Sequence, residues 1–245
     1  MKPIIQTLLS GAMILALSPM FTSCEDILGH WEKPVADVYT PTTFKVWNGT
    51  GWVKIDISSY DFTKLTPANI ASMVSEGKVI LPAGKYLIDD NITIDYNVMV
   101  DATTSTFDLY IQDGASLTIN GSLNAGDLPD GIKIAGQKDG TGKINITATT
   151  SDGITAKKMT IDGGQLLVNN SDATSVPLAV KQLEANSGSV SATNTGGAAM
   201  SVTDDVTITV GDADVSLTGT AAAITIADAS TLSIAPAYSA AKGVI

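Results

Sequence analysis

The fold is decided by the stretch GITAKKMTIDGGQLLVNN at residues 153–170. Apolar and polar side chains alternate through Met159-Thr160-Ile161, and the pair Gly163-Gly164 then interrupts the alternation. Alternation with a period of two predicts a β-strand buried on one face, and the glycines indicate a turn. The same apolar-polar-apolar triplet recurs at Ile92-Thr93-Ile94, Leu117-Thr118-Ile119, Ile144-Asn145-Ile146, Met200-Ser201-Val202, Val206-Thr207-Ile208, Val215-Ser216-Leu217, Ile224-Thr225-Ile226 and Leu232-Ser233-Ile234. We therefore predict an all-β body.

A longer repeat lies above these triplets. Segments that begin near Ile154, Leu178, Met200 and Ile224 each run into a polar turn, a second alternating strand and another polar stretch. A period of roughly 20 to 25 residues is typical of solenoid coils. The repeats are therefore expected to stack as successive coils of one solenoid.

An antiparallel β-sandwich is the alternative architecture. It is supported by dipeptides favoured in hairpin turns, namely Asp113-Gly114, Asn120-Gly121, Asp130-Gly131 and Asp162-Gly163. The aromatic residues favour the solenoid, because only Tyr238 among the 13 Phe, Tyr and Trp residues lies beyond Tyr110. A wide sandwich core normally contains aromatic side chains, whereas stacked Val, Ile, Leu, Met and Ala can fill a narrow coil.

A short helix is expected before the first coil. Thr66 can cap a helix with Pro67 at its first position, and Gly77 can end it, so the helix is predicted over Pro67 to Glu76. The pattern V-x-L-P-x-G-x-Y follows, formed by Val79, Leu81, Pro82, Gly84 and Tyr86.

These two patterns carry a family resemblance. The helix followed by V-x-L-P-x-G-x-Y resembles the N-terminal cap of right-handed parallel β-helices of the pectate-lyase-like superfamily. GITAKKMTIDGG resembles the carbohydrate-binding β-helical repeats of the same superfamily. The resemblance implies a right-handed parallel β-helix with a short N-terminal capping helix over residues 66–245, and a carbohydrate as its ligand.

The N-terminus has the pattern of an export signal. Residues 1–23 contain one positive charge, Lys2, and an apolar run interrupted by polar residues and Pro19, which indicates a cleavable signal peptide rather than a membrane-spanning helix. Met20-Phe21-Thr22-Ser23-Cys24 resembles the lipobox of bacterial lipoproteins, which implies lipidation of Cys24, the single cysteine.

The residues after Cys24 suggest where in the cell the protein is located. Acidic residues there resemble the surface-export signals of lipoproteins from Bacteroides-like bacteria, which implies an exported protein anchored by lipid in the outer membrane and facing outward. Several acyl chains are needed for durable membrane binding. We interpret residues 24–43 as lipid tether and linker.

Residues 44–65 are predicted to form a small β-hairpin region. Alternating residues from Phe44 to Ile57 flank Asn48-Gly49, a strong hairpin signal. Trp47 and Trp52 flank the turn and are our candidate glycan-binding residues, because indole faces suit the apolar faces of sugar rings. Cross-strand packing of the two rings against each other is the alternative.

Composition argues against several functions. The net charge is −11 and all 14 basic residues are lysines, so nucleic acid is not an expected partner. Cleavage of uronic acids by the lyases that the chain resembles uses an Arg or Lys base; the chain has no Arg, and the adjacent pair Lys157-Lys158 is more typical of a solvated surface. Asp204-Asp205 could supply the carboxylates for hydrolysis, but neighbouring strand residues point to opposite faces. We predict no catalytic residues.

Calcium is the one cofactor that the sequence could support. Asp204, Asp205, Asp212 and Asp214 are candidate ligands, because short carboxylates on stacked turns offer the oxygen atoms that Ca²⁺ prefers. The alternative is that aspartate occurs there as a common turn residue that bonds its own backbone.

The sequence as a whole predicts a monomeric, noncatalytic cell-surface lipoprotein that binds glycans, acidic ones through calcium. A structural adhesin or spacer with a protein partner is the alternative, and a polysaccharide lyase is the third possibility.

Overall fold

The computed structural model describes residues 43–48, 50–56, 61–102, 106–137 and 140–236. The predicted signal peptide, Cys24, the predicted tether up to residue 42 and residues 237–245 lie outside the described residues. Residues Pro41–Ile245 form one compact unit.

No helix in these described ranges combines the length and the apolar character that crossing a membrane requires.

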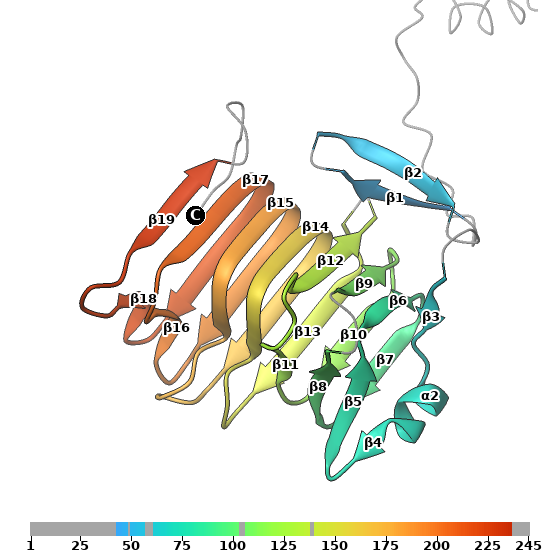
Figure 1. Cartoon of the computed structure of the whole chain (residues 1–245), viewed down its shortest axis with the longest axis horizontal. Helices are drawn as coiled ribbons and strands as arrows, with labels where there is room; N and C mark the ends of the chain where they lie inside the picture. The colour runs from blue at the N-terminus through green and yellow to red at the C-terminus, as the bar shows by residue number, and fades with distance from the viewer. Residues whose placement is uncertain (1–42, 49, 57–60, 103–105, 138–139, 237–245) are drawn as a thin grey trace, which may run out of the picture. The chain divides into compact units, whose positions relative to one another are not determined.

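The chain folds as a parallel β-solenoid of about seven turns, which lie side by side in Figure 1. Each turn contributes strands to three faces, called A, B and C here. Face A contains β3 (Thr63–Lys64), β6 (Gly84–Ile88), β9 (Phe107–Ile111), β12 (Ile132–Gly136), β19 (Leu232–Pro236) and part of each long strand β14 (Ile154–Asn170), β15 (Leu178–Asn194) and β17 (Val206–Gly219).

The other two faces are built in the same way. Face B contains β7 (Asn91–Ile94), β10 (Ser116–Ile119), β13 (Lys143–Ala148) and the last parts of β14, β15 and β17. Face C contains β5 (Lys78–Pro82), β8 (Asn97–Asp101), β11 (Leu123–Ala125), the first parts of β14 and β15, β16 (Ala198–Val202) and β18 (Ala222–Ile226).

The strand register confirms the predicted repeat. Ile154 pairs with Leu178, Leu178 with Met200, and Met200 with Ile224, so the four predicted repeat starts stack on face C. Every predicted apolar-polar-apolar triplet lies in a strand.

Inward side chains stack into columns that form one core. On face B such a column consists of Ile92, Leu117, Ile144, Leu166, Val190 and Val215, each at most 3% exposed. Burying one such side chain contributes roughly 1.5–3 kcal/mol. Tyr86 and Phe107, with ring centroids 5.4 Å apart, belong to this core in the first coils. Aliphatic residues fill it afterwards, as the aromatic distribution predicted.

Asp113-Gly114, Asn120-Gly121 and Asp130-Gly131 lie between strands of the coils, whereas Asp162-Gly163 lies within β14, where its pairing with β15 is irregular. Gly114 and Gly131 adopt φ of 79° and 75°, which glycine tolerates without strain, and strands on two different faces precede and follow each of them. Among the described residues, the antiparallel strand pairs are β1–β2 and β4–β5. The antiparallel β-sandwich is therefore wrong. The dipeptides that favoured it are typical of hairpin turns, but they serve equally well to bend a coil.

Two stacked asparagines hold the corner that follows face B. Asn170 and Asn194 are in register at the ends of β14 and β15 and are buried. The Asn194 Nδ2 donates to three backbone carbonyls, and its Oδ1 accepts from the N–H groups of Gly196 and Gly197. Asn170 likewise donates to the Ser151 carbonyl.

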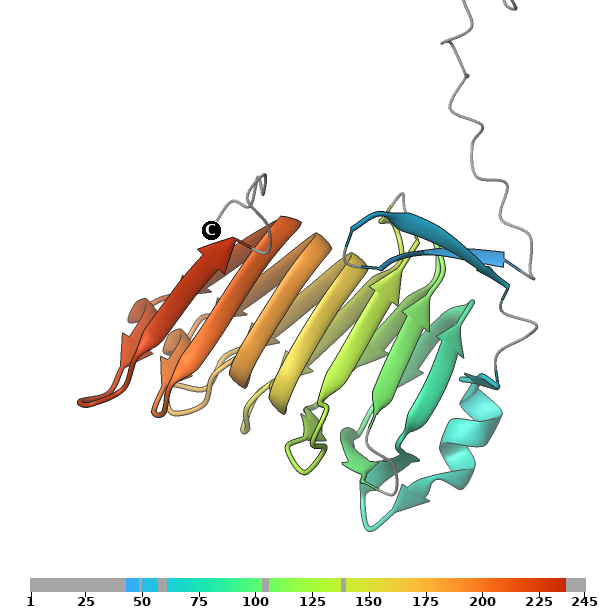
Figure 2. The ribbon, with the colours of Figure 1, turned by 45° about the horizontal axis from the view of Figure 1, so that its top comes forward.

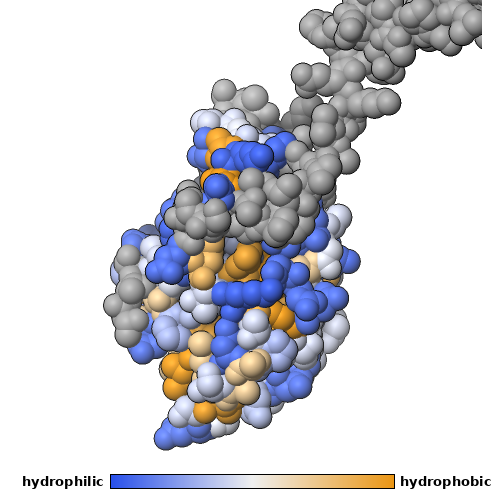
Figure 3. Space-filling view, turned by 90° about the vertical axis from the view of Figure 1, so that its right-hand side faces the viewer, coloured by the Kyte–Doolittle hydropathy of each residue, from blue (hydrophilic) through white to orange (hydrophobic). Residues whose placement is uncertain are grey.

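The capping helix is present but shorter than predicted. Helix α2 (Pro67–Ser72) begins at the N-cap Thr66 with a capping box to Asn69, and Ile70 is buried beneath it. It ends at Ser72 rather than Glu76, because β4 (Val74–Ser75) turns back onto β5 through Glu76 and Gly77, both with positive φ. Two consecutive positive φ angles are typical of a tight hairpin turn. Figure 3 shows the adjoining end of the solenoid, where polar and apolar residues are intermixed.

The predicted hairpin forms and packs against face A. Strands β1 (Thr43–Trp47) and β2 (Trp52–Asp56) pair antiparallel (Figure 2). Phe44 lies edge-on to Tyr110, with ring centroids 6.0 Å apart, and both contact the buried Ala135. Residues 63–64 pair with β6 and so belong to the solenoid.

Candidate functional site

Face B presents a row of short polar side chains to solvent. The central outward positions of its strands are in register and are occupied by Thr93, Thr118, Asn145, Leu167, Ser191 and Ser216, so the row is polar except at Leu167. Neighbouring strands in a sheet lie ~4.8 Å apart, so hydroxyl and amide groups recur at this spacing on either side of Leu167. The face can therefore hydrogen-bond an extended ligand at several successive points.

A groove lies at the corner between faces B and C, beside this row. It has a volume of about 390 Å³, and its lining includes Asp95, Tyr96, Asn120, Thr147, Thr149 and Ser151. Tyr96 is 42% exposed, an unusual degree among the aromatic residues that the structure describes. We call this site the Tyr96 groove.

Hydrogen bonds to the next coil flank the turn that carries Tyr96, including Asn120 N–H to the Ile94 carbonyl and Val98 N–H to the Ser122 carbonyl. β7 ends at Ile94, and residues 95–96 lead into β8. The Asn120 Nδ2 donates to the Asp95 carboxylate at 2.6 Å. A Cβ at Gly121 would lie 2.8 Å from the Tyr96 carbonyl oxygen, so only glycine lets the next coil approach this closely. The tyrosine is therefore held in a constrained turn.

The lining of the groove combines two kinds of chemistry. The Tyr96 ring offers a partly exposed aromatic surface, and the surrounding carboxylate, amide and hydroxyl groups offer hydrogen-bond donors and acceptors. Asp95 is the ionisable carboxylate in this lining, which contains no lysine. Such a lining suits a neutral ligand with one apolar face and many hydroxyl groups.

Sequence reasoning missed Tyr96. The available signal was an aromatic residue between Asp95 and Asn97, directly after an alternating strand, where the chain must turn. The two tryptophans beside the predicted hairpin turn were a stronger sequence signal for sugar binding, and they directed the prediction to the hairpin instead.

The two tryptophans predicted to bind glycan pack against each other across the hairpin. Trp47 and Trp52 pair directly across the hairpin, with ring centroids 5.7 Å apart and planes at 68°. Trp47 is only 8% exposed. Trp52 lies over Gly163, where an added Cβ would come within 3.0 Å of its Cη2. Cross-strand packing, the alternative, describes this pair, because the hairpin rests on the solenoid.

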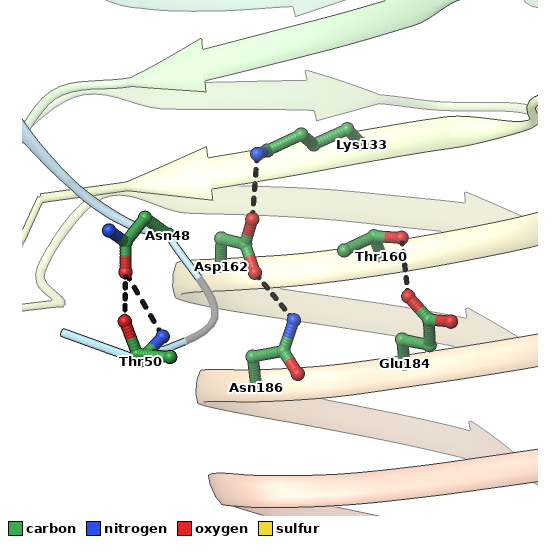
Figure 4. A network of polar contacts seen from close by, with 7 residues as sticks. All are labelled: Asn48, Thr50, Lys133, Thr160, Asp162, Glu184 and Asn186. Atoms are coloured by element: carbon green, nitrogen blue, oxygen red, sulfur yellow. Dashed lines mark hydrogen bonds and ion pairs between the residues drawn. The ribbon is translucent and has the colours of Figure 1, made fainter. Parts of the chain in front are cut away.

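Charged residues on face A form ion pairs next to the hairpin turn. Figure 4 shows the Lys133 ammonium 2.7 Å from one oxygen of the buried Asp162, whose other oxygen accepts from Asn186 at 2.8 Å. Glu184 pairs with Lys158 at 2.9 Å and accepts from Thr160 at 3.5 Å. Lysines therefore offset these carboxylates.

Asp108 belongs to the same face. Burial raises the pKa of its carboxyl group, and the nearby ammonium groups of Lys133 and Lys85 only partly oppose this rise.

The predicted calcium ligands do not converge. Asp204 pairs with Lys181 at 2.8 Å, and Asp205 accepts from the Thr231 N–H. Asp212 and Asp214 lie on β17 instead. Within the part of the chain that the structure describes, no three His, Cys, Asp or Glu residues are grouped so that they could hold a metal ion. The four predicted ligands are therefore not grouped as a metal site in the described residues, and Asp204 and Asp205 lie at the bend before β17.

The two adjacent lysines have different surroundings. Lys158 is held by Glu184, whereas Lys157 is exposed and lines a second cleft on face C. That cleft has a volume of about 280 Å³.

No family model, curated protein or solved structure matches this chain.

Proposed function

We propose that this chain is a noncatalytic, glycan-binding lipoprotein of the cell surface, and that the Tyr96 groove is its binding site. The observation that carries the proposal is an exposed aromatic ring in a polar groove, next to the side-chain hydrogen bond between Asn120 and Asp95. Sugar rings present apolar C–H faces that pack on aromatic rings, while their hydroxyl groups need both donors and acceptors.

The neighbouring polar row supports a chain-like ligand. The groove is open rather than enclosed, and Asn120 and Thr147 line it while belonging to the same coils as Thr118 and Asn145 of the row. A glycan with one sugar on Tyr96 can therefore extend along face B and hydrogen-bond its short side chains. Because Asp95 is the charge in the groove, we expect this site to favour neutral glycans over acidic ones.

Export and anchoring complete the proposal. The signal-like residues 1–23 and the lipobox-like sequence before Cys24 support lipidation and display from the outer membrane. The strand–turn–strand at Val79 to Tyr86 also supports membership of the pectate-lyase-like superfamily, since these residues form β5, its turn and β6. Metabolic labelling with a lipid precursor should mark the wild type and leave Cys24→Ala unlabelled.

The binding test is a glycan array on residues 25–245, which include the whole compact unit, with and without calcium. We expect neutral glycans to bind in both conditions. Tyr96→Ala should weaken that binding about tenfold or more, the effect of losing ~1.4 kcal/mol of contact. Met99→Ala is the matched control, because Met99 is 38% exposed on face C and does not line the groove.

Three results would count against this proposal. Silence of the array in both conditions would favour the structural adhesin or spacer. Equal binding by wild type and Tyr96→Ala would place the glycan elsewhere. New absorbance from unsaturated uronate during incubation would indicate a lyase.

A further inference from the structure

The second cleft lies on face C and spans four neighbouring coils, from Gly126 after β11 to Val206 at the start of β17. Its walls come from β14, β15 and β16 and from the turn before β17, and include Thr155, Lys157, Lys181, Ser201, Thr203 and Asp204. We call it the lysine cleft. Its volume of about 280 Å³ lies just below the ~300–1,000 Å³ of typical small-molecule pockets, and therefore suits one small group.

The strand register places the two ammonium groups on adjacent coils. Ala156 pairs with Val180, and Lys158 pairs with Gln182, so Lys157 and Lys181 occupy the intervening position on neighbouring strands. Strands in a sheet are ~4.8 Å apart, which brings two like charges near each other in an open cleft. An anion between them would relieve this repulsion and gain two charge-assisted hydrogen bonds.

The neighbouring carboxylate neutralises only one of the two lysines. Asp204 lies 2.8 Å from the Lys181 ammonium, and both side chains are more than 60% exposed. Exposed ion pairs of this kind are weak, so an incoming anion can compete for Lys181. Lys157 is itself exposed, and the described residues provide it with no ion-pair partner within 4.0 Å.

The remaining lining suits the body of a sugar. Thr155, Ser201 and Thr203 provide hydroxyl groups, while Ala179 and Val180 provide a small apolar surface. We infer that the lysine cleft binds a single saccharide unit that carries a carboxylate or sulfate, directly and without calcium. This inference rests on the proposed glycan function and extends it to a second subsite that prefers anionic rather than neutral sugars. The lysine cleft shares no lining residue with the Tyr96 groove.

The test is an NMR titration of isotope-labelled residues 25–245 with glucuronate, glucose 6-sulfate and glucose in physiological salt. We expect both anionic sugars to shift the amide signals of Thr155, Lys157, Lys181 and Thr203 in a saturable way, with a chelator present. Glucose should bind there at least about tenfold more weakly.

Charge-neutralising variants separate the cleft from general electrostatics. Lys157→Gln with Lys181→Gln should weaken binding of both anionic sugars about tenfold or more. The control double variant Lys54→Gln with Lys143→Gln changes the net charge equally and should bind like the wild type, because neither residue lines the cleft. Tyr96→Ala should also leave this binding unchanged, so the two sites can fail separately.

Several outcomes would overturn the inference. They are equal affinity for glucose, an equal loss in the control double variant, or signal changes scattered over the surface lysines. Inorganic sulfate that shifts the same amides with the same affinity would show that the cleft takes an anion and not a sugar.

Discussion

Asp108 illustrates how a single residue responds to its place on face A. Its carboxyl group lies in an outward position, yet its pKa is raised, first by burial and then by the nearby Asp162 carboxylate, against the opposing ammonium groups of Lys133 and Lys85. The folded state therefore holds the proton more tightly than the unfolded chain does. The free energy of unfolding consequently falls as pH rises from the ordinary aspartate range, near ~4, through the raised pKa.

Replacing this carboxyl group should remove that pH dependence. In Asp108→Asn the charge never forms, so the melting temperature of the variant relative to wild type should increase between pH 4 and pH 7. Thermal melts at both pH values measure this difference. The exposed Asp127→Asn is the control and should show no such increase. A difference that shrinks with pH would mean that the lysines outweigh burial.

The same scale shows where residue-level prediction ends. Alternation correctly placed Thr93 outward and Ile92 inward, because a strand fixes side-chain direction locally. Alternation could not show that Trp47 is buried whereas Tyr96 is exposed. Trp47 is covered at the end of β1, a strand that contacts the distant strands β12 and β14, and such long-range contacts leave no mark in the neighbouring sequence.

Among the structural elements, the corners differ more from expectation than the strands. Strand triplets and the Thr66 cap were predicted from short-range patterns and are present. The helix ended early, because residues 74–75 gain strand hydrogen bonds with β5 that a helix continuing to Glu76 would exclude. The burial of Asn170 and Asn194 was not predicted, because Asn is common in polar turns and its burial depends on the coil stacked next to it.

The corner after β15 should be the most sensitive polar position. Asn194→Ala would leave three carbonyls and the N–H groups of Gly196 and Gly197 without these partners. Each buried polar group left unpaired costs ~1–3 kcal/mol, so we expect a loss of at least about 3 kcal/mol in urea unfolding. Asn145→Ala, an outward position on face B, should cost less than about 0.5 kcal/mol. Similar losses in both variants would contradict the role assigned to this corner.

Across the whole molecule, the two ends of the described solenoid differ. Helix α2 contacts the first coils and buries Ile70, whereas β18 and β19 expose Ile226 by 54% and Ile234 by 46%. The repeat made the solenoid predictable, because one spacing recurs through the chain. The seat of the hairpin on face A was not predictable, since its contacts with Tyr110 and Gly163 join segments without a shared pattern.

This asymmetry should appear in hydrogen exchange. In a solenoid each coil is stabilised mainly by its neighbours, so the last described coil should open most easily. We expect amides of β18 and β19 to exchange faster than those of β13 and β14. The protection of amides in β5 and β6, at the other end, should be closer to that of the central strands β13 and β14. Mass spectrometry of exchanged peptides measures this order. Equal protection of β19 and β14 would show that the end is covered.

The parallel stacking of coils also determines how the molecule responds to force. Hydrogen bonds between coils run along the solenoid axis, from β14 to β15 and from β15 to β17. Tension along that axis therefore loads one ladder at a time, and coils would peel apart in sequence. Tension across the axis loads the many bonds of neighbouring ladders in shear. A ligand bound along face B would contact several coils and so would resist their separation under tension.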